Sequence, residues 1–125
     1  MSSSIEIKLE GSTLDAWVAR RAVMHLIGDE SSVEFVSDAM LITSELVTNA
    51  TMHSDGPGVL RAEYRQQLLR VEVTDGSDAL PEMTADHYTA AGGRGLRLVN
   101  DLATRWGVRQ LLPGKTMWFE LTAEA

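Results

Sequence analysis

The sequence contains no cysteine, which excludes a disulfide framework, a thiolate nucleophile and any zinc or iron–sulfur site held by thiolates. It also lacks an uncharged apolar run close to the roughly 20 residues that a membrane-spanning helix needs. Its amino terminus carries charges where a signal peptide has its apolar stretch. We therefore expect a cytoplasmic protein with no membrane association.

Basic charge is scarce as well. The chain has 11 lysines and arginines against 18 aspartates and glutamates, which gives a net charge of −7. Binding to a nucleic-acid backbone depends on lysine and arginine side chains that neutralise phosphates. A chain with this balance is not expected to bind nucleic acid directly.

Apolar residues, in contrast, are sufficient for a core. The chain has 125 residues, of which 44% are hydrophobic, and a folded chain of this size buries roughly two-thirds of the surface that its unfolded form exposes. No internal repeat or linker interrupts it. We expect a single domain over residues 1–125.

Hydrophobic periodicity predicts the order of the secondary-structure elements. Alternation of apolar and polar residues predicts strands at 5–9, 60–64, 69–73, 106–112 and 116–121. Helical spacing predicts helices at 14–27, 31–53 and 92–103. The second of these is expected to begin with a capping box formed by Ser31 and Glu34. Residues 79–91 follow neither period and are expected to form a loop.

The order of these elements predicts the fold class. Consecutive strands in two hairpins favour a mostly antiparallel sheet, and the three helices need a face of that sheet to cover. We therefore predict an α+β fold, a two-layer sandwich with the helices packed on one face of the sheet. The outward residues of the hairpins are mostly charged, so the other face is expected to contact solvent.

The first candidate site lies on the second predicted helix. Glu45, Asn49 and His53 are spaced four residues apart, and each such step turns about 40° around a helix, so the three share one face. An acid and an amide one turn apart can hold Mg²⁺ through an oxygen atom and place a base beside it. A solvated polar stripe is the alternative. Zinc is disfavoured, because only His53 is a strong zinc ligand.

Two further segments carry candidate residues. Asp75 ends a predicted strand, where a carboxylate can accept a hydrogen bond from an exocyclic amine such as that of adenine; a turn aspartate is the alternative, since Asp-Gly is a frequent turn pair. Residues 92–95, Gly-Gly-Arg-Gly, precede a helix and offer backbone amides to an anion. Glycines that simply begin a helix are the alternative there. The sequence has neither a Walker nor a Rossmann motif.

Together these segments resemble the sequence boxes of the GHKL ATPases, which include gyrases, histidine kinases and mismatch-repair ATPases. The order and spacing of residues 45–53, 73–77, 93–96 and 114–116 match the N, G1, G2 and G3 boxes. The short length and the Ser-Glu-Leu-Val-Thr-Asn-Ala run at 44–50 are similar to the anti-sigma-factor serine/threonine kinase branch. The resemblance covers nearly the whole chain.

The resemblance implies a Bergerat-type ATP pocket between the helices and the sheet, closed by a lid at residues 78–91. It implies that Glu45 is the general base, that Asn49 binds Mg²⁺ and that Asp75 meets the adenine amino group. The other residues of the implied ATP site are Ser77, Gly93, Arg94, Gly95, Leu96 and Thr116. For His53 it implies a packing or helix-ending position.

One box departs from the family pattern. The fuller G1 box reads Asp-x-Gly-x-Gly, whereas Ser77 and Ala79 stand at the two glycine positions of this chain. A Cβ atom at each position restricts backbone conformations that glycine can adopt. The departure bears on the affinity for ATP rather than on the fold.

The expected function is that of an anti-sigma-factor serine/threonine kinase. With ATP and Mg²⁺ it would transfer the γ-phosphate to a protein antagonist, and in another state it would bind a sigma factor. The resemblance also implies a homodimer formed near the first strand and first helix. The alternative is a non-catalytic module that binds proteins with ATP or without nucleotide. Ser77 and Ala79 favour this alternative, whereas the Glu45 and Asn49 pair favours the enzyme.

Overall fold

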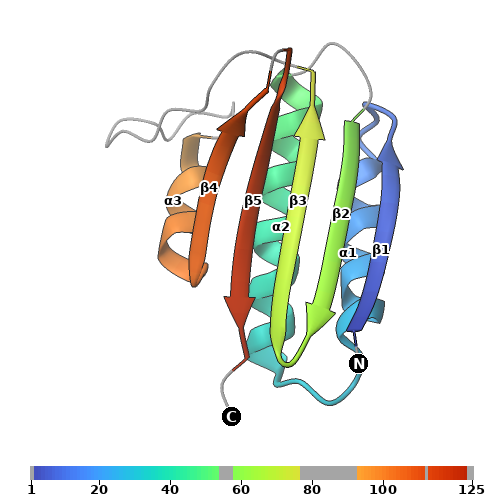
Figure 1. Ribbon diagram of the computed structural model, residues 1–125, viewed down its shortest axis with the longest axis vertical. Helices are drawn as coiled ribbons and strands as arrows, with labels where there is room; N and C mark the ends of the chain where they lie inside the picture. Colours follow the sequence, from blue (N-terminus) through green and yellow to red (C-terminus); the bar gives the residue numbers. More distant parts are fainter. Residues whose placement is uncertain (1, 54–57, 77–92, 112, 124–125) are drawn as a thin grey trace.

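The protein forms two layers, a sheet and a set of helices, in a computed structural model that describes residues 2–53, 58–76, 93–111 and 113–123 (Figure 1). The sheet has five strands in the order β1-β2-β3-β5-β4, and every neighbouring pair is antiparallel. The three described helices all cover one face of this sheet. The predicted fold class, an α+β two-layer sandwich, is confirmed.

The elements follow the predicted order. They are β1 (Ser2–Leu9), α1 (Asp15–Ile27), α2 (Val33–His53), β2 (Gly58–Arg65), β3 (Leu68–Asp75), α3 (Gly93–Leu102), β4 (Arg105–Gln110) and β5 (Lys115–Thr122). β1 is longer than its apolar alternation predicts, because Ser2, Ser3 and Ser4 pair through the main chain with the end of β2. Main-chain pairing at a sheet edge leaves no hydrophobic pattern in the sequence.

The hydrophobic core lies between α2 and the middle of the sheet. Ile42, Leu46 and Val47 on α2 are buried, and so are Val71 on β3 and Phe119 on β5. Fully burying a side chain of this size contributes roughly 1.5–3 kcal/mol relative to its exposed form. α2 contacts α1, α3, β3 and β5, so it is the element against which the others are placed.

The amino terminus of α2 corrects the predicted capping box. The Ser32 hydroxyl accepts a hydrogen bond from the Phe35 amide at 3.1 Å, so Ser32, and not Ser31, caps the helix. The Ser31 hydroxyl is instead 3.2 Å from the phenolic oxygen of Tyr64 on β2. The prediction misplaced the cap by one residue because two serines stand side by side and only the tertiary contact with Tyr64 distinguishes them.

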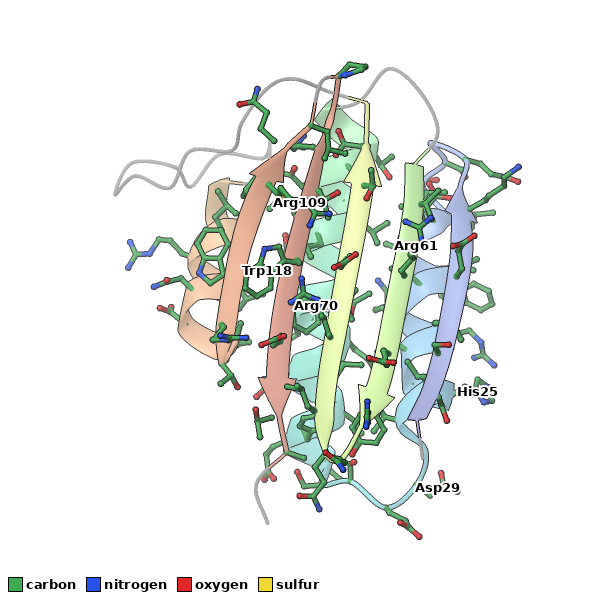
Figure 2. The ribbon with its side chains drawn as sticks, viewed as in Figure 1. His25, Asp29, Arg61, Arg70, Arg109 and Trp118 are labelled. Atoms are coloured by element: carbon green, nitrogen blue, oxygen red, sulfur yellow. The ribbon has the colours of Figure 1, made fainter. Side chains whose placement is uncertain are left out.

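The outer face of the sheet carries the predicted charges (Figure 2). Glu120 on β5 accepts hydrogen bonds from Arg105 on β4 at 2.9 Å and from Arg70 on β3 at 3.0 Å. The Arg70 guanidinium also lies 4.4 Å from the ring centroid of Trp118. Gly107 gives this ring room, since a Cβ there would lie 2.9 Å from the indole. Burial alone would raise the pKa of Glu120, but the hydrogen bonds and charges of Arg105 and Arg70 outweigh it and hold this pKa below its ordinary value.

Glu120→Gln is expected to lower the free energy of unfolding at neutral pH by about 1–3 kcal/mol, because two guanidinium groups lose a mostly buried charged acceptor. The folded-state pKa of Glu120 is depressed. Its contribution is therefore complete above the unfolded-state pKa, near 4.3, and is lost as the pH falls through the lower folded-state value. Urea denaturation from neutral pH to about pH 3 should show the difference between the two proteins shrinking.

The matched control is Glu6→Gln. Glu6 pairs with Arg61 at 2.7 Å, but both side chains are more than half exposed, so the expected change is below about 0.5 kcal/mol. A loss of unfolding free energy in Glu120→Gln that stays constant over the whole pH range would show that the ionised Glu120 carboxylate is not what stabilises the fold.

Candidate functional site

Glu45 and Asn49 lie on the flank of α2 that is turned away from α1. On the opposite flank, the Ser44 hydroxyl accepts a hydrogen bond from Arg20 of α1 at 3.0 Å. Successive helical residues are about 100° apart, which puts Glu45 and Asn49 well away from the α1 contact. α2 runs between α1 and α3 (Figure 1), so this flank faces α3.

Both side chains are half-buried, and this has an electrostatic consequence for the acid. Burial raises the pKa of Glu45 above its ordinary value. A carboxylate held in partly desolvated surroundings is a stronger base than one in water. Such a group costs folding energy when it is ionised, which is typical of a functional position.

Asp75 lies at the end of β3 and is paired with Lys115, the first residue of β5. The two residues are direct neighbours in the β3–β5 register. The Lys115 ammonium donates to Asp75 Oδ1 at 3.1 Å, and the side chains are 1% and 2% exposed respectively. The backbone is fitted closely here, because a Cβ on Gly114 would collide with the main-chain oxygen of Asp75. The candidate carboxylate is thus buried and occupied by an ammonium group of the same chain.

Thr116, the residue predicted near the adenine, is not brought to Asp75. It pairs with Thr74 in the sheet, and its hydroxyl lies 2.8 Å from the Thr74 hydroxyl. Side chains alternate between the faces of a strand, so Thr116 faces away from the helices and Lys115 faces Asp75. The sequence did carry a signal for Lys115: it occupies the same alternation as Met117, Phe119 and Leu121, where a lysine is out of place without a buried partner.

A small cavity joins Asp75 to α2. It measures about 10 Å³, and its lining residues are Leu9, Gly11, Asp15, Ala50, Thr51, Gly58 and Asp75. This is about the volume that one water molecule needs. Ala50 and Thr51 belong to the last turn of α2, so the carboxyl-terminal end of this helix and the end of β3 meet at this point.

Asp15 shapes the wall of this cavity. Its carboxylate accepts hydrogen bonds from the backbone amides of Glu10, Gly11 and Ser12 at 3.2, 2.9 and 3.2 Å. These bonds hold the turn between β1 and α1 against the end of the sheet. The sequence analysis did not single out Asp15, although an acid within the first turn of a predicted helix is a common capping signal.

The glycine segment begins α3. Gly93, Arg94 and Gly95 form the first turn of this helix, where backbone amides have no intrahelical acceptor and the helix dipole is positive. Leu96 is buried in the hydrophobic core, so its side chain packs within the protein. Ser77, the expected lid at 78–91 and the side chains of His53 and Arg94 lie outside the described residues.

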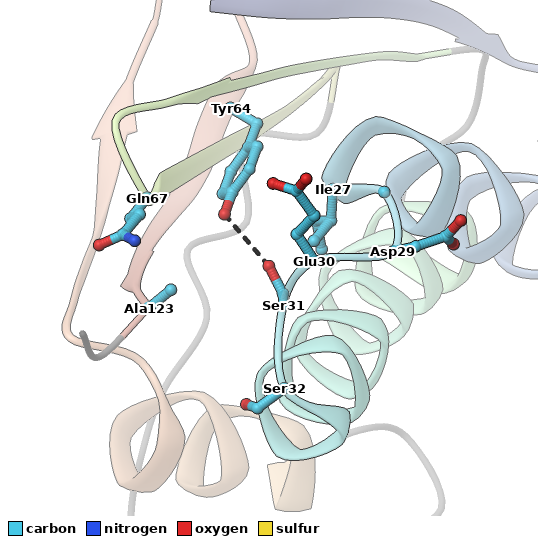
Figure 3. Close-up of a pocket in the computed structure, with 9 residues that line it drawn as sticks. Ile27, Asp29, Glu30, Ser31, Ser32, Tyr64, Gln67 and Ala123 are labelled. Atoms are coloured by element: carbon cyan, nitrogen blue, oxygen red, sulfur yellow. Dashed lines mark hydrogen bonds between the residues drawn. The ribbon is translucent and has the colours of Figure 1, made fainter.

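A second cavity, of about 580 Å³, lies at the other end of α2 (Figure 3). It is lined by the segment between α1 and α2 and by Tyr64, Gln67 and Ala123. The Tyr64 and Ser31 hydroxyls meet across it. None of the predicted site residues lines this cavity, whereas Asp75 lines the small cavity at the end of β3.

Metal-ligand clusters and helices that could span a membrane are both absent from the described residues. Among these residues, no cluster of three or more His, Asp and Glu side chains has the arrangement of a metal site. None of the described helices combines the length and the apolar character that crossing a bilayer requires.

Comparison with solved structures identifies the fold. The chain superimposes on the structure of the RsbU and RsbW domains of Rv1364c from Mycobacterium tuberculosis with a TM-score of 0.74 and 18% identity, over 97% of this chain and 32% of that chain. It is also similar to the histidine kinase domain of the blue-light activated histidine kinase EL346 from Erythrobacter litoralis, with a TM-score of 0.57 and 24% identity, over 86% of this chain and 59% of that one.

At these identities the likeness establishes the fold alone, which is the two-layer arrangement of sheet and helices that the sequence predicts. This chain spans less than two thirds of either neighbour. No protein-family model matches the sequence, and no curated protein is significantly similar to it. The roles of individual residues therefore depend on the geometry of this chain's own site.

Asp75→Asn is expected to lower the free energy of unfolding of the nucleotide-free protein by about 3–5 kcal/mol, because the Lys115 ammonium would stay buried without its carboxylate. Combining Asp75→Asn with Lys115→Met should recover much of this loss, since neither charge remains. Urea denaturation of the four proteins of this double-mutant cycle measures the coupling. Additive effects of the two substitutions would show that the ion pair contributes nothing.

Proposed function

We propose that this protein binds ATP with Mg²⁺ and transfers the γ-phosphate to a serine or threonine of a protein antagonist, as an anti-sigma-factor kinase. One arrangement supports this proposal. Glu45 and Asn49 share the flank of α2 that is turned away from α1, and Ala50 of the same helix lines a small cavity with the buried Asp75 at the end of β3. The GHKL fold and the first turn of α3 agree with it.

The donor set suits the implied nucleotide and metal. Asn49 would hold Mg²⁺ through its amide oxygen, and one protein oxygen is enough because Mg²⁺ in nucleotide sites keeps waters and phosphates as its other ligands. The amides of Gly93, Arg94 and Gly95 would bind phosphate oxygens. Asp75 would accept from the exocyclic amine of the base. Bound ATP would supply the phosphoryl group.

Glu45 would hold the proton that leaves the substrate hydroxyl. The raised pKa of Glu45, caused by burial, brings its basicity closer to that required at neutral pH. As the hydroxyl oxygen bonds to the γ-phosphorus of bound ATP and the bond from that phosphorus to the leaving ADP oxygen breaks, the proton would pass to a Glu45 carboxylate oxygen. The helix amides at the start of α3 would offset the charge that develops on the phosphate oxygens.

The proposed partners are proteins, namely a sigma factor and its antagonist. Phosphorylation would act by placing a charge where the complex buries a neutral hydroxyl. β1 is an edge strand, paired only with β2 in the described sheet, and it is the place where a homodimer would form. A cytoplasmic location fits this function.

A second candidate is a protein-binding module that has lost nucleotide turnover or nucleotide binding. One specific observation favours it: Lys115 occupies the Asp75 carboxylate. Transfer of labelled phosphate to an antagonist distinguishes the two candidates, because only the kinase transfers the γ-phosphate. Direct titration of ATP with Mg²⁺ then shows whether a module without turnover still binds nucleotide.

Glu45→Gln is expected to slow phosphotransfer to an antagonist by about 10²–10⁴-fold, because the variant cannot accept the hydroxyl proton. ATP affinity should stay nearly unchanged, since Glu45 is assigned no contact with the nucleotide. Single-turnover transfer of labelled phosphate and calorimetric titration measure the two effects separately. Glu34→Gln, an exposed acid in the first turn of the same helix, serves as the control, and equal transfer rates for all three proteins would exclude Glu45 as the base.

The pH dependence of the transfer rate should report Glu45. Because burial raises the pKa of this group, the rate should fall with decreasing pH at a midpoint above about 4.3, the ordinary value for glutamate. The same raised pKa means that Glu45 stabilises the fold only when protonated, and this contribution is lost as the pH rises through the folded-state value. The measurement is a pH–rate profile of the natural chain from about pH 4 to pH 8. A rate that does not fall at the acidic end would contradict the assignment of Glu45 as the base.

A further inference from the structure

Lys115 lies in a position where a lysine is normally unfavourable. It belongs to the helix-facing side of β5, together with Met117, Phe119 and Leu121, and its side chain is 1% exposed. Removing an ammonium group from water costs several kcal/mol unless an opposite charge receives it. Asp75 is that charge, so the lysine and the aspartate each make the burial of the other tolerable.

The backbone around the pair keeps Lys115 next to Asp75. The β3–β5 register pairs the two residues directly. Gly114, with φ +93°, leaves no room for a side chain against the Asp75 main chain. On the other side of β3, a Cβ on Gly58 would lie 2.5 Å from the Thr74 carbonyl oxygen. The strand ends are therefore fitted tightly, and the lysine side chain is the part that can rearrange.

We propose that Lys115 sets the nucleotide affinity of this protein, because its ammonium group occupies the Asp75 carboxylate oxygen that a purine amino group would use. This inference rests on the proposed function, which assigns Asp75 to the base. Both groups are N–H donors to the same carboxylate, so the charge that one neutralises is no longer available to the other. The chain thus carries a side chain that would compete with the nucleotide for the Asp75 carboxylate.

The balance of hydrogen-bond strengths favours the lysine. A hydrogen bond between ammonium and carboxylate is roughly twice as strong as one from a neutral donor, and the exocyclic amine of a purine is neutral. The cavity that the described residues form beside Asp75 is about 10 Å³, far smaller than a purine ring. A base would gain the full hydrogen bond to Asp75 only when Lys115 has withdrawn from the carboxylate, so the apparent affinity would be reduced by the fraction of molecules in which it has withdrawn.

The test is a calorimetric titration of ATP with Mg²⁺ into the natural chain and its Lys115 variants. Lys115→Met keeps the length of the side chain and removes the competing donor, so its ATP affinity should rise by at least about tenfold. Lys115→Gln keeps a neutral donor for Asp75 and should show a smaller rise. It also serves as the test protein if the methionine variant does not fold, as judged by circular dichroism.

Two controls isolate the effect. Lys8→Met makes the same chemical change at the other lysine of the chain, which is exposed on β1, and should leave ATP affinity unchanged. Asp75→Asn combined with Lys115→Met removes both charges. This double variant should lose the gain in affinity, because the acceptor is altered as well.

The outcomes separate this inference from the proposed function. If the natural chain binds ATP and the folded Lys115 variants bind it no more tightly, Lys115 is not a competitor and the kinase proposal stands. If neither the natural chain nor any folded Lys115 variant binds ATP at millimolar concentration, the nucleotide assignment of Asp75 fails, and the inference fails with it.

Discussion

The ion pair between Lys115 and Asp75 is the interaction on which the candidate site depends. Two fully buried charges persist only as a pair, because either one alone would cost several kcal/mol. The pair joins the end of β3 to the start of β5, and Asp75 lines a cavity with Ala50 and Thr51 of α2. It therefore fixes the position of the Asp75 carboxylate relative to the carboxyl-terminal end of α2.

The two faces of the sheet use charge in opposite ways. On the outer face, Arg70 and Arg105 hold the pKa of Glu120 below its ordinary value, so the ionised acid stabilises the fold. On the inner side, burial raises the pKa of Glu45, so the ionised acid is held at a cost to stability. A cost of this kind is commonly found where a side chain serves chemistry rather than folding.

The fold tolerates wide changes of sequence, whereas the site does not follow from the fold. Structures with 18% and 24% identity to this chain share its arrangement of sheet and helices, because an alternating apolar pattern is enough to bury the same face of each element. The chemistry depends on single side chains placed on that frame. Lys115 illustrates this, since this one residue supplies the buried charge that pairs with the Asp75 carboxylate.

The sequence alone determined the element order, the two-layer α+β fold and the spacing that puts Glu45 and Asn49 on one side of α2, because periodicity and helix geometry are local properties. It could not decide the capping serine of α2, the residue opposite Asp75 or the burial of the lysine. Those depend on the β3–β5 register and on contacts such as Ser31 with Tyr64. Residues distant in sequence make these contacts, and a shift of one position in a strand turns its side chain to the other face. Only the tertiary structure could therefore identify Lys115 as the neighbour of Asp75.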